Sequence, residues 1–182
     1  MMNINKKNIL KYEDAYDKQY RCTDGEKVEI KMKFLLKKQG YLTRANLITI
    51  GDWKAPRARR HYSSMQNCND RVKQISQFSF GTRDEKTRIE SLDSLVGVGY
   101  PIASTILHFA FPRKYPIMDF RVIRSLGLKQ PSTYKFDFWK GYCKKIQAIS
   151  KKYSLSIRTV DKALWKYDEL NSGRRRTCGQ HE

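Results

Sequence analysis

The chain has 182 residues, enough for one domain with a hydrophobic core and too few for two ordinary ones. Its 37 Lys and Arg residues against 18 Asp and Glu residues give a formal net charge of +19, and this excess indicates a polyphosphate partner. No stretch approaches the ~20 apolar residues of a membrane span, and residues 1–12 lack the apolar core of a signal peptide. We therefore expect a cytoplasmic protein with no membrane partner.

Helical spacing of apolar residues dominates the chain, whereas the alternation typical of strands is weak. Gly40, Thr43 and Pro101 stand where helices end or begin, and Pro56 precedes an expected loop over 57–61. We predict an all-α fold of about eight or nine helices, in a single domain over 1–173 with a disordered basic tail over 174–182. The segments with helical spacing are, in chain order, 6–19, 27–39, 44–53, 69–81, 84–95, 101–110, 116–127, 136–153 and 156–171.

A glycine-rich turn separates two of these helices, and together they form a helix-hairpin-helix element over about 84–110. Alternate glycines allow a tight turn and a close approach of the backbone to another surface. The free N–H groups of the turn and of the following helix N-terminus suit a phosphate. The same turn could hold a monovalent cation, and the alternative is a plain helix–helix turn. The predicted phosphate-binding residues are Val96, Gly97, Val98, Gly99 and Tyr100.

The four cysteines are scattered, and no two of them form a C-x-x-C pair. This spacing excludes a locally assembled zinc site and argues against an iron–sulfur cluster. The three histidines show no metal-ligand spacing either, and we interpret His108 as a helix-surface residue. Apart from the monovalent cation that the hairpin could hold, we expect no metal and no other cofactor, and we place Cys143 in the core.

An aspartate, Asp119, follows Gly99 by twenty positions in the segment Tyr115-Pro116-Ile117-Met118-Asp119-Phe120-Arg121-Val122. Together with the hairpin, this block resembles the helix-hairpin-helix DNA glycosylase superfamily, which includes adenine-mismatch, endonuclease III-like and alkylpurine glycosylases. The resemblance implies a two-lobed helical fold, with a central lobe over about 43–127 and the terminal helices paired in a second lobe. It also implies that double-stranded DNA lies across the cleft, with one base swung out into a pocket beside the aspartate.

Three departures from the family pattern limit what the resemblance implies. Val96 replaces a proline, which is a minor change. Pro101 stands where the lyase-type members carry a Schiff-base lysine, and proline has no amine to form that covalent intermediate. The four-cysteine cluster motif of the endonuclease III-like branch is absent. The resemblance therefore implies a monofunctional glycosylase without lyase activity and without an iron–sulfur cluster.

Asp119 is the candidate catalytic residue. Cleavage of an N-glycosidic bond builds positive charge on the sugar, and a fixed carboxylate stabilises that charge and orients a water. The alternative is that Asp119 only caps the helix that begins at Phe120. The hairpin at its fixed distance favours the catalytic interpretation.

Further candidates for contacts with DNA or with the extruded base combine aromatic and basic side chains near the ends of predicted helices. Aromatic rings stack on bases, and Arg and Lys pair with phosphates. The alternatives are an ordinary core role for Trp53 and a solvated basic face for Arg121. These candidates are Trp53, Lys54, Arg57, Tyr115 and Arg121.

The sequence thus predicts a monomeric DNA N-glycosylase of base excision repair, associated with the nucleoid, that removes a damaged or mismatched base. Two alternatives remain open. In the first, the protein is a non-catalytic DNA-binding or damage-recognition module. In the second, it binds or modifies RNA with the same phosphate grip.

Overall fold

A computed structural model describes residues 1–172, and all regular structure within that range is helical. The all-α prediction is confirmed, while the predicted basic tail over 174–182 lies outside the described residues. None of the described helices is both long and apolar enough to span a bilayer. The helices are α1 (Lys6–Tyr20), α2 (Asp24–Gln39), α3 (Arg44–Lys54), the 3₁₀ helix η1 (Pro56–Ala58), α4 (Arg59–Tyr62), α5 (Asn69–Gly81), α6 (Glu85–Asp93), α7 (Tyr100–Ala110), α8 (Phe120–Ser125), α9 (Phe136–Tyr153) and α10 (Ile157–Ser172).

Local capping explains where several of these helices begin and end. The Thr43 hydroxyl accepts from the backbone N–H of Asn46, whose side chain accepts in turn from the N–H of Thr43, so α3 starts with a complete capping box. Gly40 adopts φ 71° and ends α2 in the left-handed conformation that glycine tolerates best. Asp84 caps α6 by accepting from the N–H of Thr87.

Two predicted boundaries were wrong. Residues 56–62 form η1 and α4 rather than a loop, because Pro56 occupies the first position of a helical turn, where its missing N–H costs nothing. Residues 116–119 are not helical, and α8 starts only at Phe120. Asp119 has extended dihedral angles and caps α8, so its side chain stands at the end of an extended segment rather than inside a helix.

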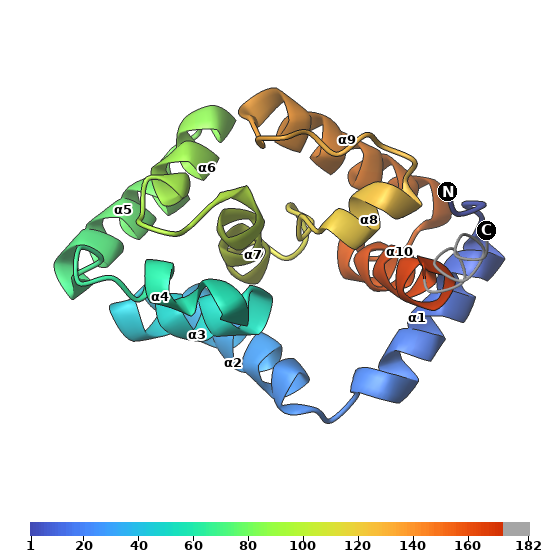
Figure 1. Cartoon of the computed structure of the whole chain (residues 1–182), viewed down its shortest axis with the longest axis horizontal. Helices are drawn as coiled ribbons and strands as arrows, with labels where there is room; N and C mark the ends of the chain where they lie inside the picture. Colours follow the sequence, from blue (N-terminus) through green and yellow to red (C-terminus); the bar gives the residue numbers. More distant parts are fainter. Residues whose placement is uncertain (173–182) are drawn as a thin grey trace, which may run out of the picture.

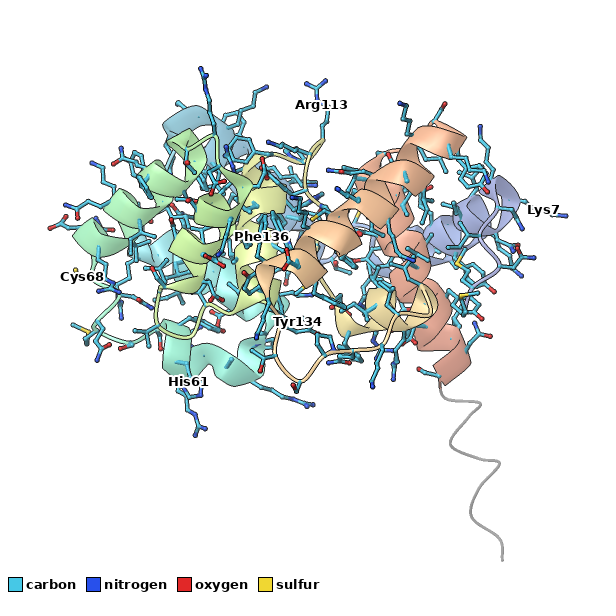
Figure 2. The ribbon with its side chains drawn as sticks, turned by 90° about the horizontal axis from the view of Figure 1, so that it is seen from above. Lys7, His61, Cys68, Arg113, Tyr134 and Phe136 are labelled. Carbon is cyan, nitrogen blue, oxygen red and sulfur yellow. The ribbon has the colours of Figure 1, made fainter. Side chains whose placement is uncertain are left out.

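The helices pack as two groups, which are visible side by side in Figure 1. The first lobe consists of α2 to α7, with α7 near the middle of the molecule, and the second lobe consists of α1, α8, α9 and α10. In Figure 2, Cys68 lies at the outer end of the first lobe and Lys7 at the outer end of the second. The first lobe differs from the predicted central lobe over 43–127 in two helices. It includes α2, and it does not include α8, because α8 packs on α10.

The extended segment between α7 and α8 connects the two lobes through buried hydrogen bonds. The N–H of Met118 donates to Ser104 Oγ on α7 (2.9 Å), and Tyr142 Oη on α9 donates to the carbonyl of Ile117 (2.7 Å). A buried extended strand needs partners for its polar backbone groups, and these side chains provide them. The segment is thereby fixed, and Asp119 directly follows it.

Candidate functional site

Asp119 makes two contacts that fix both of its carboxylate oxygens. Oδ1 accepts from the backbone N–H of Arg121 (2.9 Å), which is the cap of α8. Oδ2 lies 2.5 Å from Nζ of Lys54, at the end of α3 in the other lobe. The side chains of Asp119 and Lys54 are 16% and 9% exposed, so the ion pair is largely shielded from water and screened little by salt. Asp119 is therefore a cap and a pocket residue at once.

The pair opens onto a pocket of about 580 Å³ between the two lobes. A pocket of this size lies within the range that small-molecule sites occupy. Its walls come from α1, the start of α2, the end of α3, the 117–122 segment and α10. The lining residues are Tyr16, Asp17, Tyr20, Thr23, Gly25, Glu26, Glu29, Trp53, Lys54, Arg57, Ile117, Asp119, Phe120, Arg121, Val122, Arg158, Asp161, Lys162 and Trp165.

Aromatic rings form much of the pocket wall. Trp53 is half-buried, donates its Nε1–H to the carbonyl of Gly25 (2.8 Å) and packs edge-on against Phe109. Trp165 meets Tyr16 and Tyr20 edge-to-face on the opposite lobe. Planar rings on both sides of a pocket suit a flat, π-rich ligand, because such rings stack favourably on one another.

Phe120 is the exposed aromatic residue beside the candidate catalytic carboxylate. It is 45% exposed and lines the pocket, and the guanidinium groups of Arg121 and Arg124 lie 5.4 and 5.1 Å from its ring centre. Both arginines also pair with Asp168, at 3.3 and 2.5 Å. Arg121 is thus held in place beside the pocket, where its charge can attract a phosphate.

Charged side chains meet behind the aromatic wall. Glu29 on α2 accepts from Nε and a terminal nitrogen of Arg158 on α10 (2.9 and 2.6 Å) and from Nζ of Lys33 (2.6 Å). Burial alone would raise the pKa of Glu29, but the charges of Arg158 and Lys33 outweigh it and lower the pKa to about 2. This bidentate pair joins the two lobes, and both of its residues line the pocket.

Burial also shifts the pKa values of Asp161 and His108. Burial raises the pKa of Asp161 to about 7, against the opposing charge of Arg158. Burial lowers the pKa of His108 to about 3, so the imidazole is neutral near pH 7. His108 was predicted to lie on the helix surface, and this prediction was wrong, because the residue is fully buried. Its Nδ1 lies 2.7 Å from the carbonyl oxygen of Tyr115, and this hydrogen bond compensates for the loss of water around the ring. A carbonyl can only accept, so Nδ1 carries the proton, and Nε2 is an acceptor that has no partner among residues 1–172.

The hairpin between α6 and α7 combines buried anchors with exposed glycines. Leu95 and Val98 are buried and anchor the hairpin in the core, while Gly97 and Gly99 are exposed. In the described part of the chain, the N–H groups of Gly97, Gly99 and Tyr100 have no acceptor. Val96 is different, because Asn67 both accepts from its N–H (3.0 Å) and donates to its carbonyl (2.9 Å). The turn thus carries three backbone N–H groups without an acceptor among the described residues, and a cluster of such groups can bind an anion.

The two glycines of the turn have different roles. Gly97 adopts φ 75°, and a Cβ there would stand 2.5 Å from Cβ of His61 and from the backbone N of Tyr62. Gly99 has φ −69°, and its nearest neighbour would be Pro101 Cδ at 3.7 Å. Of the two glycines, only Gly97 therefore adopts the positive φ that glycine tolerates best. Figure 2 shows His61 at one edge of the protein, opposite Arg113.

The structure brings four of the five further candidates to the pocket. Trp53, Lys54, Arg57 and Arg121 line it, and Arg57 is exposed at its rim. Tyr115 does not line it. Its hydroxyl donates to Glu85 (2.7 Å), and its buried ring stacks on Trp139, so it packs the core between the lobes.

Several pocket residues were not among the sequence candidates. The sequence contains a signal for Asp161, because this residue falls at helical spacing among apolar residues of α10 that are buried together as one stripe, namely Ile157, Val160 and Leu164. A carboxylate on such a stripe indicates a polar group that is buried for a reason. Phe120 and Trp165 had no such signal, because aromatic residues at helical spacing are ordinarily core.

Among residues 1–172, no three His, Cys, Asp or Glu side chains are grouped to hold a metal ion. No family model, curated protein or solved structure matches the chain.

Proposed function

We propose that the chain is a DNA-binding N-glycosylase that removes a damaged or mismatched base by hydrolysis, with Asp119 as the catalytic carboxylate. One observation carries this proposal. The aspartate that follows the hairpin by twenty residues lines an aromatic pocket between the two lobes. The pocket offers flat walls for a base and a fixed carboxylate for the sugar beside it.

In this reaction the bond between the base and C1′ breaks, positive charge develops on the sugar, and the base leaves with the bonding electrons. The Asp119 carboxylate faces that charge and orients a water whose oxygen bonds to C1′, and the proton released from the water balances the one gained by the base. Lys54 and the N–H of Arg121 act as positioning groups, because they fix one oxygen each. A carboxylate held in this way needs no rearrangement when charge develops.

DNA would be held by its phosphates. The free N–H groups of Gly97, Gly99 and Tyr100 suit one phosphate, and the net charge of +19 favours the duplex at long range. Arg57 and Arg121 at the pocket add cations where an extruded nucleotide would enter. Phe120 is the exposed ring that can stack on a base there.

The test is release of bases from a panel of duplexes, each with one damaged or mismatched base, followed by cleavage of the abasic sites formed. On any duplex that the parent protein acts on, Asp119→Asn is expected to lower the rate on the order of a hundredfold or more. Binding to the duplex should persist, because the amide can still cap α8.

The matched control is Asp84→Asn, which changes an aspartate with the same capping role at the start of α6. It should leave base release unchanged, because Asp84 does not line the pocket. Base release by Asp119→Asn at the parental rate would contradict the catalytic assignment.

A second candidate function is a non-catalytic DNA-binding module. The observation that favours it is the complete engagement of Asp119 as a helix cap and ion-pair partner. In that case no duplex of the panel loses its base, while binding to damaged duplexes persists. Competition between duplex DNA and RNA at one salt concentration separates both functions from RNA binding.

A further inference from the structure

Asp161 lies against the pocket with one carboxylate oxygen unused. The residue is 2% exposed and lines the pocket from α10. Its Oδ2 accepts from the backbone N–H of Ile117 at 2.9 Å. Its Oδ1 is buried and has no hydrogen-bond partner in the described structure. A buried carboxylate oxygen without a donor is costly, and a hydrogen-bond donor on a bound ligand would offset that cost.

The neighbouring cations are already engaged elsewhere. Arg158 donates through two nitrogens to Glu29, and Nζ of Lys54 lies 2.5 Å from Asp119. Their charges lower the pKa of Asp161 only in part, and burial still leaves it at about 7, with Glu29 adding to the increase. The internal donors around the pocket therefore leave Oδ1 free for a ligand.

We propose that Oδ1 of Asp161 accepts a hydrogen bond from an exocyclic amino group of the base that enters the pocket. The pocket would thereby select amino-bearing bases over bases that offer only acceptors at that edge. This inference rests on the proposed function, since it names the class of base that the same pocket takes. The aromatic walls supply stacking that every base can use, so a polar group on the pocket wall must supply the discrimination.

Because of the hydrogen bond from Ile117, one substitution can replace the acceptor at Oδ1 by a donor and so reverse the expected choice of base. Its N–H can only donate, so in the Asp161→Asn variant the amide oxygen takes the place of Oδ2. The amide NH₂ then takes the place of Oδ1 and offers a donor to the pocket. The variant should therefore prefer a base that accepts at this edge, and size and backbone contact are retained.

The probes are two pairs of free nucleosides that differ by the amino group alone. One pair is 2′-deoxyadenosine and purine 2′-deoxyriboside, and the other is 2′-deoxycytidine and its analogue without the 4-amino group. Binding is measured by NMR at pH 8, where the Asp161 carboxylate is ionised. A hydrogen bond to a charged group corresponds to a preference on the order of tenfold, so the parent should prefer the amino-bearing member of at least one pair by about that factor.

The Asp161→Asn variant should lose or reverse this preference, while Asp84→Asn should keep it. Equal affinities within both pairs, no binding of any nucleoside by the parent, or an unchanged preference in a folded Asp161→Asn protein would each overturn the inference. Thermal unfolding followed by circular dichroism shows whether the variant is folded.

Base release from the duplex panel separates this inference from the proposed function. A preference that reverses in Asp161→Asn, with no base release from any duplex, would support the amino-group contact and contradict the glycosylase. Base release without any effect of Asp161→Asn on the choice of base would support the glycosylase and contradict the contact.

Discussion

Replacing Asp161 by asparagine should make the protein more stable at neutral pH, and the gain should disappear in acid. Burial raises the pKa of this carboxyl from an ordinary value of 3.8 to about 7. Between about pH 4 and 7 the native protein therefore holds a proton that the unfolded chain has lost. Because the native state binds more protons there, its free energy of unfolding falls as the pH rises. Asparagine does not titrate and avoids this loss.

The size of the effect follows from the shift. A rise from 3.8 to about 7 is roughly three pKa units, and each unit corresponds to 1.36 kcal/mol, so the change is about 4 kcal/mol. The residue is 2% exposed, so solvent screening reduces this little. The difference in the free energy of unfolding, Asp161→Asn minus parent, should therefore increase by about 4 kcal/mol between pH 4 and pH 8.

Urea unfolding of both proteins at several pH values measures this difference. The difference is informative because the other buried groups contribute equally to both proteins. His108, with its pKa lowered to about 3, destabilises both as the pH falls below about 6.5, and Glu29, with a pKa of about 2, does so at still lower pH. A difference that stays constant from pH 4 to pH 8 would refute the reasoning, because Asp161 would then ionise as it does in water.

Four other predictions concern the hairpin, the binding of DNA and the pocket. Gly97→Ala should destabilise the fold by on the order of 2 kcal/mol because its Cβ would meet the backbone of α4, whereas Gly99→Ala should not, and chemical denaturation tests both. Gly99→Val, in a folded protein, should weaken duplex binding, and a titration that finds parental affinity would contradict the phosphate role of the turn. Duplex affinity of the parent should fall steeply with salt, and a flat dependence of log Kd on log salt concentration would exclude phosphate-dominated binding. Borohydride should trap no covalent DNA adduct, since Nζ of Lys54 is held by Asp119; an adduct that Lys54→Arg abolishes would show the opposite.

Local signals in the sequence predicted most of the helices. The apolar spacing of residues 136–153 predicted α9 with its observed ends, and Thr43 was recognised as the cap of α3. Such signals act over three or four residues, so one stretch of sequence contains them completely. The start of α8 was predicted wrongly because Pro116 permits a helix to begin there. In the structure, the N–H groups of Ile117 and Met118 donate to the side chains of Asp161 and Ser104 instead, and these long-range hydrogen bonds hold the segment extended.

The pocket depends on contacts that no local pattern contains. Lys54 was a candidate for its position near a helix end, but its pairing with Asp119 joins residues 65 positions apart. His108 was placed on the surface because histidine is usually polar and exposed, whereas a carbonyl of the following loop compensates its burial. Asp161 was not among the predicted site residues. Its position on the buried stripe of α10 is a local signal, but its partner Ile117 comes 44 residues earlier in the chain, so its place in the pocket could not be predicted.

The pairing of α1 with α10 has a consequence for the order of folding. Helices α2 to α7 follow one another in sequence and pack among themselves, so the first lobe can form while the chain is still being made. Helix α1 packs mainly on α10, and contacts between the two, such as Glu13 with Thr159, span 146 residues. Closing so long a loop is slow. We expect the apolar face of α1 to stay uncovered until α10 has been made, so that the pocket forms after the first lobe.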